Sequence, residues 1–145
     1  MQEGKAVPIF LSFKESIQAL STKLGTTCII AGDHIGNVRE ENRLRFQRRA
    51  ERIIVCSILC GGESIDLDDQ TGEYPTDSLI CPDFSAQRII QAIGRTQRSK
   101  TKSKSIQRFC FASGTIEDRM RQCVMEKARN IQTLNDYDLI GGLKL

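Results

Sequence analysis

The stretch Gln91-Ala92-Ile93-Gly94-Arg95-Thr96-Gln97-Arg98 decides how this chain is interpreted. It sets Arg95 and Arg98 three residues apart, directly after an apolar segment with helical spacing. A guanidinium is planar, permanently charged and able to donate two parallel hydrogen bonds, so it suits phosphate oxygens. Two guanidinium groups on one structured turn can therefore grip a polyphosphate. A solvated basic loop is the alternative, because runs of charge are usually wet surface.

The basic character continues beyond this stretch, and no acid lies between Ala86 and Arg108. Lys100, Lys102 and Lys104 predict a less structured basic surface that binds a nucleic-acid backbone. Its affinity should fall steeply as the salt concentration rises. An acidic segment, residues 63–77, precedes the basic run, and the net charge is only +3. This distribution favours local sites over a generally basic coat.

The spacing Gln-x-x-Gly-Arg-x-x-Arg resembles motif VI of the superfamily 2 helicases and translocases. Residues 7–13 resemble motif IV, and residues 53–57 followed by 61–67 resemble motif V. Residues 113–119 resemble the Gly-Thr-Ile/Val-Glu segment that follows motif VI in the chromatin-remodelling branch. The four segments occur in the family's order, and the resemblance covers about residues 7–131. We identify the chain as similar to this family.

The resemblance implies a role for each matching position. Arg95 and Arg98 would reach across a cleft to the γ-phosphate of ATP held by a partner lobe, with large effects on rate. The residues implied near the nucleotide are Gln91, Gly94 and Asp66. Those implied at the DNA or RNA backbone are Ser12, Ser57, Gly61, Gly62, Lys100, Lys102 and Lys104. Ser64 and Ile58 depart from the family, which usually has Gly and Thr there.

The printed sequence contains neither Gly-x-x-x-x-Gly-Lys-Ser/Thr nor an acidic box after an apolar strand. Because these elements hold MgATP, the chain resembles the C-terminal lobe alone, and no ATPase activity is expected from it by itself. ATP and Mg²⁺ are implied only with an N-terminal ATP-binding lobe. Three interpretations stay open: half of a split ATP-dependent translocase, a non-catalytic module that binds nucleic acid or protein, and a truncated remnant.

Alternating apolar and helical segments predict an α/β fold with right-handed parallel crossovers. With the resemblance, we expect a RecA-like three-layer domain over residues 1–133, with a mainly parallel sheet of about five or six strands, helices on both faces, and a tail at 134–145. The strands are expected at residues 7–12, 28–31, 53–59, 78–81 and 106–112. Ligands in such sheets bind at the carboxyl ends of the strands. Ser12, Gly32, residues 57–66 and residues 82–83 would gather there.

Several local signals predict helix ends and buried faces. Ser12 with Glu15, and Asn37 with Glu40, are spaced as capping boxes, and Ser85 and Thr115 are placed to start later helices. Gly25 is placed as a helix stop. The positions expected in the core include Phe10, Phe13, Val38, Phe46, Ile116, Met120, Val124 and Ile131.

Composition narrows the class of protein further. The chain has 145 residues, which predicts one domain, and six cysteines without a Cys-x-x-Cys pair. His34 is the only histidine, so neither a zinc site nor any other metal site is expected. No run approaches the roughly 18 apolar residues that span a bilayer, so no membrane partner is expected. Reduced thiols and the absence of a signal-peptide pattern predict a cytoplasmic or nuclear protein that is not secreted.

Overall fold

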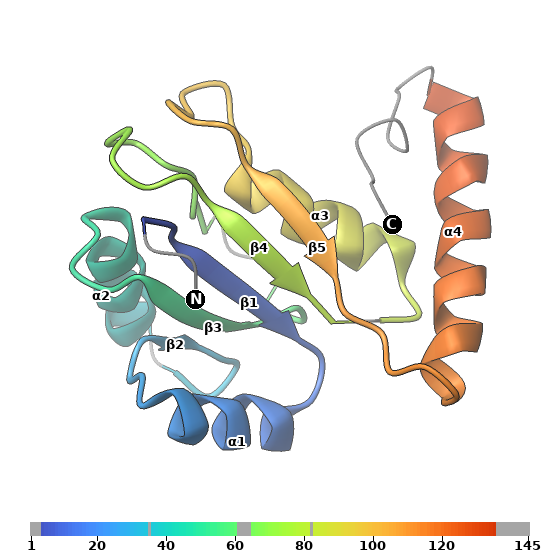
Figure 1. Cartoon of the computed structure of the whole chain (residues 1–145), viewed down its shortest axis with the longest axis horizontal. Coiled ribbons are helices and arrows are strands. Elements are labelled where there is room, and N and C mark those ends of the chain that lie inside the picture. Colours follow the sequence, from blue (N-terminus) through green and yellow to red (C-terminus); the bar gives the residue numbers. More distant parts are fainter. Residues whose placement is uncertain (1–3, 35, 61–64, 82, 136–145) are drawn as a thin grey trace.

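The computed structural model of the chain describes residues 4–34, 36–60, 65–81 and 83–135, with side chains up to Lys127. Strands and helices alternate along the chain (Figure 1). Their order is β1 (Val7–Leu11), α1 (Lys14–Leu24), β2 (Ile29–Ile30), α2 (Gly36–Gln47), β3 (Ile53–Ser57), β4 (Asp77–Ile80), α3 (Ala86–Thr96), β5 (Ile106–Phe109) and α4 (Ile116–Asn135).

The five strands form one sheet in the order β2-β3-β1-β4-β5, and every pairing is parallel. The central strand β1 pairs with β3 from Val7↔Ile53 to Leu11↔Ser57. The near-continuous apolar runs of β1 and β3 fit a sheet that is covered on both faces. The predicted α/β fold with a parallel sheet of about five strands is confirmed.

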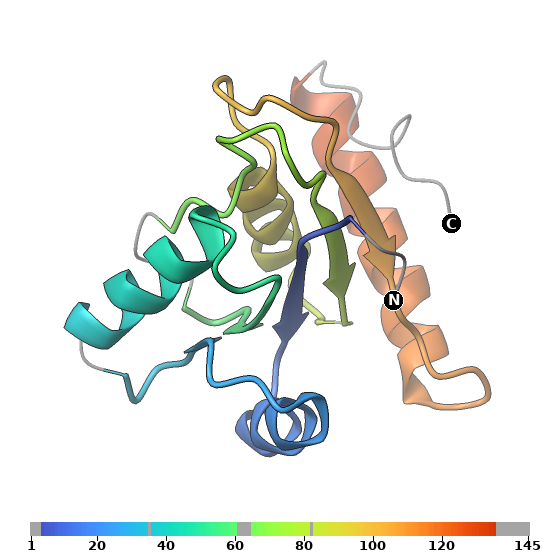
Figure 2. The same cartoon turned by 60° about the vertical axis from the view of Figure 1, so that its left-hand side comes forward.

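Helices cover both faces of the sheet (Figures 1 and 2). On one face, Ile17 of α1 packs with Ile9, Leu11 and Val55. The larger core lies on the other face, under α2 and α3. Its members include Phe10, Ile30, Phe46, Ile54, Ile80, Ile89 and Ala92. The long helix α4 packs chiefly against α3 and adds Val124 to this core.

The start of α1 differs from the sequence-based expectation. The helix begins at Lys14, its N-cap is Phe13, and no side chain caps it. Ser12 therefore does not cap the helix; its hydroxyl donates a hydrogen bond to Asp83 Oδ2 at 3.1 Å. The predicted cap is wrong because the carboxylate, from the connection after β4, takes the hydroxyl instead.

The second predicted capping box is also wrong, whereas other end signals are confirmed. Helix α2 already includes Asn37 in its first turn, and Glu40 binds Arg43 one turn later instead of reaching back. Gly25 ends α1 in the left-handed region at φ 66°, where glycine carries no Cβ penalty. Ser85 caps α3 by accepting from the Arg88 amide.

Burial corrects three of the predicted core positions. Phe13 is 65% exposed, Val38 is 42% exposed and Ile116 is 68% exposed, whereas Phe10 and Phe46 are buried. Helical spacing predicts which residues share an apolar face, but it does not predict how far along the helix that face contacts the sheet. All three exposed residues lie at or beside the first turn of a helix, where this contact is missing. The side chain of Ile131 lies outside the described residues. In the part of the chain that the structure describes, no helix has the length and hydrophobicity to traverse a bilayer.

Candidate nucleotide and nucleic-acid sites

Arg95 lies in the last turn of α3 and is only 9% exposed. Its Nη2 donates to the Cys60 carbonyl, just beyond β3, at 3.3 Å. Its own carbonyl accepts from the Leu67 amide at 2.8 Å. Arg95 thus joins the end of α3 to the chain at Cys60 and at Leu67, in the region that resembles motif V.

Arg98 follows the helix and pairs with Asp66, with Nη2 and Oδ1 2.9 Å apart. The two side chains are 47% and 42% exposed, so the pair lies at the surface, where solvent can reach both charges. The structure therefore brings Arg98 and Asp66 together, as expected if motifs V and VI meet. Because exposed pairs contribute at most about 1 kcal/mol, a phosphate can compete with Asp66 for this guanidinium.

The guanidinium of Arg95 is buried, whereas that of Arg98 is half-exposed. Burial lowers the pKa of the Arg95 guanidinium, and the neighbouring positive charge of Arg98 acts in the same direction. The side chain nevertheless keeps its charge at any physiological pH, because arginine starts above 12. A buried cation beside a surface cation makes this corner electropositive, which suits a polyphosphate.

Gln91 and Gly94 lie on α3 within one turn of Arg95, so the three residues share one side of the helix. Gln91 is exposed, and Gly94 is half-buried. A Cβ placed on Gly94 would meet no atom within 4 Å. The Gly94 backbone is thus open to close approach from outside the domain, although nothing within the domain requires a glycine there.

A separate cavity of about 430 Å³ lies at the carboxyl edge of the sheet. Its polar lining includes Ser12, Lys14, Asp33, Arg39 and Ser57. Ser12 and Lys14 lie at the start of α1, Ser57 ends β3 and Arg39 comes from α2. Hydroxyls, an ammonium and a guanidinium are groups that bind phosphate oxygens. The predicted gathering at this edge is confirmed for Ser12, Gly32 and Ser57, which line the cavity, and for Asp83, which accepts a hydrogen bond from Ser12. Residues 61–64 and 82 lie outside the described residues.

The cavity also contains charged residues that the sequence analysis did not select. Arg39 of α2 donates to the carbonyls of Ala31 and Gly32, at 3.2 and 3.0 Å. Lys14 and Asp33 form an ion pair at the rim, which raises the pKa of Lys14 and lowers that of Asp33. No motif pointed to Arg39, because its position depends on how α2 packs against β2.

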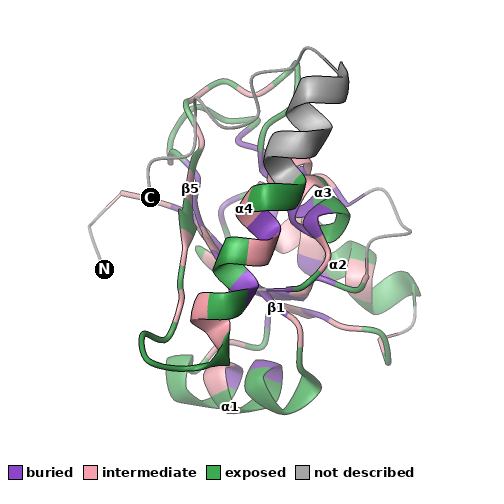
Figure 3. Ribbon diagram, turned by 90° about the vertical axis from the view of Figure 1, so that its right-hand side faces the viewer, coloured by how far each residue is buried: buried purple, intermediate pink, exposed green. Residues whose placement is uncertain are grey.

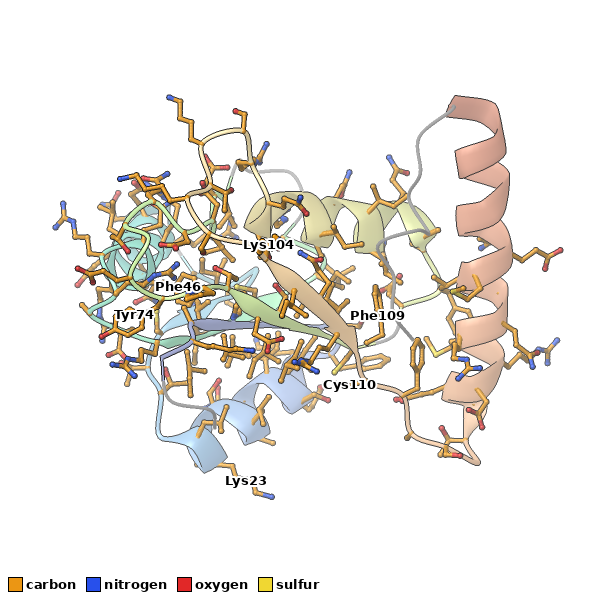
Figure 4. The ribbon with its side chains drawn as sticks, turned by 45° about the horizontal axis from the view of Figure 1, so that its top comes forward. Lys23, Phe46, Tyr74, Lys104, Phe109 and Cys110 are labelled. Atoms are coloured by element: carbon orange, nitrogen blue, oxygen red, sulfur yellow. The ribbon has the colours of Figure 1, made fainter. Side chains whose placement is uncertain are left out.

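The lysines predicted to bind nucleic acid lie elsewhere. Lys100, Lys102 and Lys104 occupy the loop between α3 and β5, at the amino edge of the sheet, so they do not line the cavity. Figure 4 shows Lys104 at one end of β5 and Cys110 at the other. The structure thus divides the predicted nucleic-acid residues between two edges. Gly61, Gly62 and Ser64 lie outside the described residues.

Metal binding has no obvious place in the described part of the chain. No group of three or more His, Cys, Asp or Glu side chains in these ranges is arranged to hold an ion. The cysteines among the described residues are free thiols.

No family model matches the chain. Over 142 residues it is 35% identical to a protein of Acanthamoeba polyphaga mimivirus named "Putative ATP-dependent RNA helicase L364". The match covers 97% of this chain and 26% of the viral protein, so the chain spans about a quarter of that relative.

Solved structures with the same fold come from helicase lobes. The C-terminal part of the Fun30 ATPase domain matches with a TM-score of 0.68 and 23% identity, over 83% of this chain and 39% of that one. The C-terminal domain of the DEAD-box protein Dbp5 matches with a TM-score of 0.61 and 17% identity, over 94% and 74%. The Escherichia coli DEAD-box protein SrmB gives 0.56 and 20%, over 74% and 62%. The chain therefore has the fold of the C-terminal, RecA-like lobe of the superfamily 2 helicases.

Proposed function

We propose that the chain acts as the C-terminal lobe of an ATP-dependent nucleic-acid helicase or translocase and supplies Arg95 and Arg98 to ATP held by an N-terminal lobe. The observation that carries this proposal is the half-exposed Arg98–Asp66 pair beside the buried Arg95. A guanidinium held loosely by a surface carboxylate can transfer to a phosphoryl group that carries more charge.

In this proposal, Asp66 holds Arg98 in place while the lobe is alone. When ATP and Mg²⁺ arrive on the partner lobe, the γ-phosphate replaces the carboxylate as the partner of Arg98. Arg95 helps to fix the position of Asp66, because its guanidinium and its carbonyl both bind the segment that carries Asp66. Gly94 leaves room for the nucleotide or the partner lobe, with Gln91 beside it.

The nucleic acid would bind at the carboxyl-edge cavity through Ser12, Lys14 and Ser57. Hydroxyls and cations of this kind contact phosphates and so position a strand without reading its sequence. The name of the mimivirus relative favours RNA. The segment 113–119 favours the chromatin-remodelling-type branch.

A non-catalytic binding module is the second candidate. It is favoured by the burial of Arg95 and by the carboxylate already bound to Arg98, since both arginines then have structural partners. In that case the cavity and the lysines would bind nucleic acid without any dependence on ATP.

The experiment that separates the two candidates measures nucleic-acid-stimulated ATP hydrolysis by this lobe joined to a helicase N-terminal lobe that carries the phosphate-binding loop. Arg98→Ala is expected to lower turnover by on the order of 10³-fold or more, the range found for arginines supplied to a transferring phosphoryl group. Arg88→Ala is the matched control, because Arg88 lies on the same helix, pairs with Asp83 and is equally exposed. Turnover by Arg98→Ala equal to that of Arg88→Ala would exclude the supply of Arg98 to ATP and leave the binding module and the truncated remnant.

A further inference from the structure

The loop of residues 97–105, called here the lysine loop, is held at its start by Asp66 and Asp68, through Arg98 and Thr101, and at its middle by the buried Asp69. Asp69 is fully buried, and its Oδ2 accepts from the Ser103 hydroxyl at 2.6 Å. The Asp69 carbonyl accepts from the Lys102 amide at 2.8 Å. Two bonds from a single residue thus hold the middle of the lysine loop.

The same carboxylate is itself held from the other side. Its Oδ1 accepts from the amides of Thr71 and Gly72 and from the Thr71 hydroxyl, at 2.9 to 3.1 Å. The buried guanidinium of Arg49 lies 3.2 Å from it. The lysine loop is therefore tied through Asp69 to the motif V segment and to the turn after α2.

The three lysines of this loop carry charges that the domain does not neutralise. Lys100, Lys102 and Lys104 are exposed, and among the residues that the structure describes none of their ammonium groups has an ion-pair partner. Nearby cations do have partners: Lys5 and Arg108 both bind Asp77. The loop thus presents three unneutralised charges on a fixed backbone, which is the complement of a phosphodiester strand.

We propose that the lysine loop is a second phosphate-backbone surface, at the amino edge of the sheet, and that Asp69 is its positioning residue. The inference rests on the proposed function, in that the strand is the nucleic acid bound at the carboxyl-edge cavity. The five residues of β1 set the two edges roughly 15 Å apart, at about 3.3 Å per residue. This distance is a minimum, because the cavity lies at the ends of β1 and β3 whereas the loop precedes the edge strand β5. A strand must exceed it to contact both surfaces, and a shorter one contacts either alone.

The first test uses fluorescence anisotropy with a labelled oligouridylate, and with oligothymidylate for DNA, over a range of salt concentrations. Replacing all three lysines by glutamine is expected to reduce the slope of log K against log salt by about 2, since each contact to a single strand contributes about 0.7. The ratio of the variant's Kd to that of the wild type then shrinks about twentyfold between 50 and 200 mM salt.

Two controls locate this effect. Lys23→Gln removes an exposed lysine that points away from the domain at the end of α1 (Figure 4), and it is expected to change the slope less than Lys102→Gln. Lys14→Gln removes one cation from the cavity and is expected to lower the slope by about 0.7 independently of the loop. If the triple variant keeps the wild-type slope while Lys14→Gln lowers it, the second surface is disproved and the proposed function stands. If the wild type itself binds neither oligonucleotide, the nucleic-acid part of the proposed function fails.

The second test distinguishes positioning from simple charge. Asp69→Asn removes a negative charge near the lysines, so electrostatics alone would strengthen binding. The positioning role instead predicts weaker binding and a smaller slope, because the loop loses its anchor. Ser103→Ala removes a single bond to the anchor and should weaken binding in the same direction while the fold is kept. Glu73→Gln is the matched control, since it removes an exposed acid from the same segment.

Thermal unfolding confirms that each variant is folded at the temperature of the binding assay. Binding by both Asp69→Asn and Ser103→Ala that equals or exceeds that of Glu73→Gln would overturn the positioning role. Loss of affinity for a partner lobe without loss of the salt slope would also overturn the proposal, because the loop would then be a protein contact.

Discussion

At the scale of single residues, charged groups inside this domain do structural work that sequence patterns do not reveal. Burial alone would raise the pKa of Asp69, but hydrogen bonds from Ser103, Gly72, Thr71 and Arg49 outweigh it and lower the pKa to about 2. Asp66, three residues earlier, is half-exposed and pairs with Arg98. Two acids of one short segment therefore have different tasks, one holding a loop and the other holding an arginine.

The lowered pKa of Asp69 predicts how stability depends on pH. Because its folded-state pKa lies below the unfolded value, the carboxylate favours the folded state fully above about pH 4, and this contribution is lost as the pH falls towards 2. The shift corresponds to about 2 kcal/mol of unfolding free energy. Urea unfolding at several pH values between 5 and 2 measures it, and Asp69→Asn should flatten that part of the profile. An unchanged profile in this variant would contradict the assignment.

At the scale of elements, α3 carries both the core and the site. Ile89 and Ala92 face the core, whereas Gln91 and Gly94 face outward near the arginines. A glycine inside a helix costs about 0.5–1 kcal/mol relative to alanine, and nothing in the domain fills the space where its Cβ would lie. Nothing in the described part of the domain therefore accounts for a glycine at this position, and its open surface is compatible with the close approach of a second lobe.

Gly94→Ala is therefore expected to stabilise the lobe by about 0.5–1 kcal/mol and to lower ATP turnover in the two-lobe enzyme. Thermal unfolding and stimulated hydrolysis measure the two effects separately. Gly25→Ala is the contrasting variant, because Gly25 has a positive φ and its replacement should destabilise by about 1 kcal/mol. Unimpaired turnover by Gly94→Ala would show that the backbone there needs no close approach.

The elements also show what could be predicted from the sequence and what could not. The parallel order of the sheet follows from continuous apolar strands separated by helical segments, and the end of α1 follows from Gly25. The resemblance implies that Arg98 and Asp66 both lie near the nucleotide, and the two side chains do lie together. The predicted cap at Ser12 is wrong although the gathering of strand ends predicts Asp83 at the same edge, because the capping pattern does not report that a distant carboxylate takes the hydroxyl. The residues predicted to bind nucleic acid lie at two edges because Ser12 follows β1 whereas Lys100, Lys102 and Lys104 precede β5.

At the scale of the whole molecule, α4 packs at the periphery of the domain (Figures 1 and 3). Met120 and Val124 are its buried side chains in the described part of the chain, and Lys127 donates to the Phe84 carbonyl at 3.1 Å. The sheet, by contrast, is covered on both faces. Elements with few buried apolar contacts open at lower free energy than the core, so we expect α4 to detach before the sheet unfolds.

Val124→Ala tests this expectation. Deleting two buried methyl groups costs about 2 kcal/mol, and here the loss should appear as faster hydrogen exchange in α4, with the slowest amides of β1 and β3 unchanged. Val55→Ala makes the same truncation in the centre of the sheet, where the side chain is fully buried, and should speed exchange in all of the most protected amides. If Val124→Ala speeds exchange equally in α4 and β1, the helix belongs to the same cooperative unit as the sheet. A helix that opens alone can change position while the sheet stays folded, and because α4 packs chiefly against α3 its opening would first affect the helix that carries Arg95.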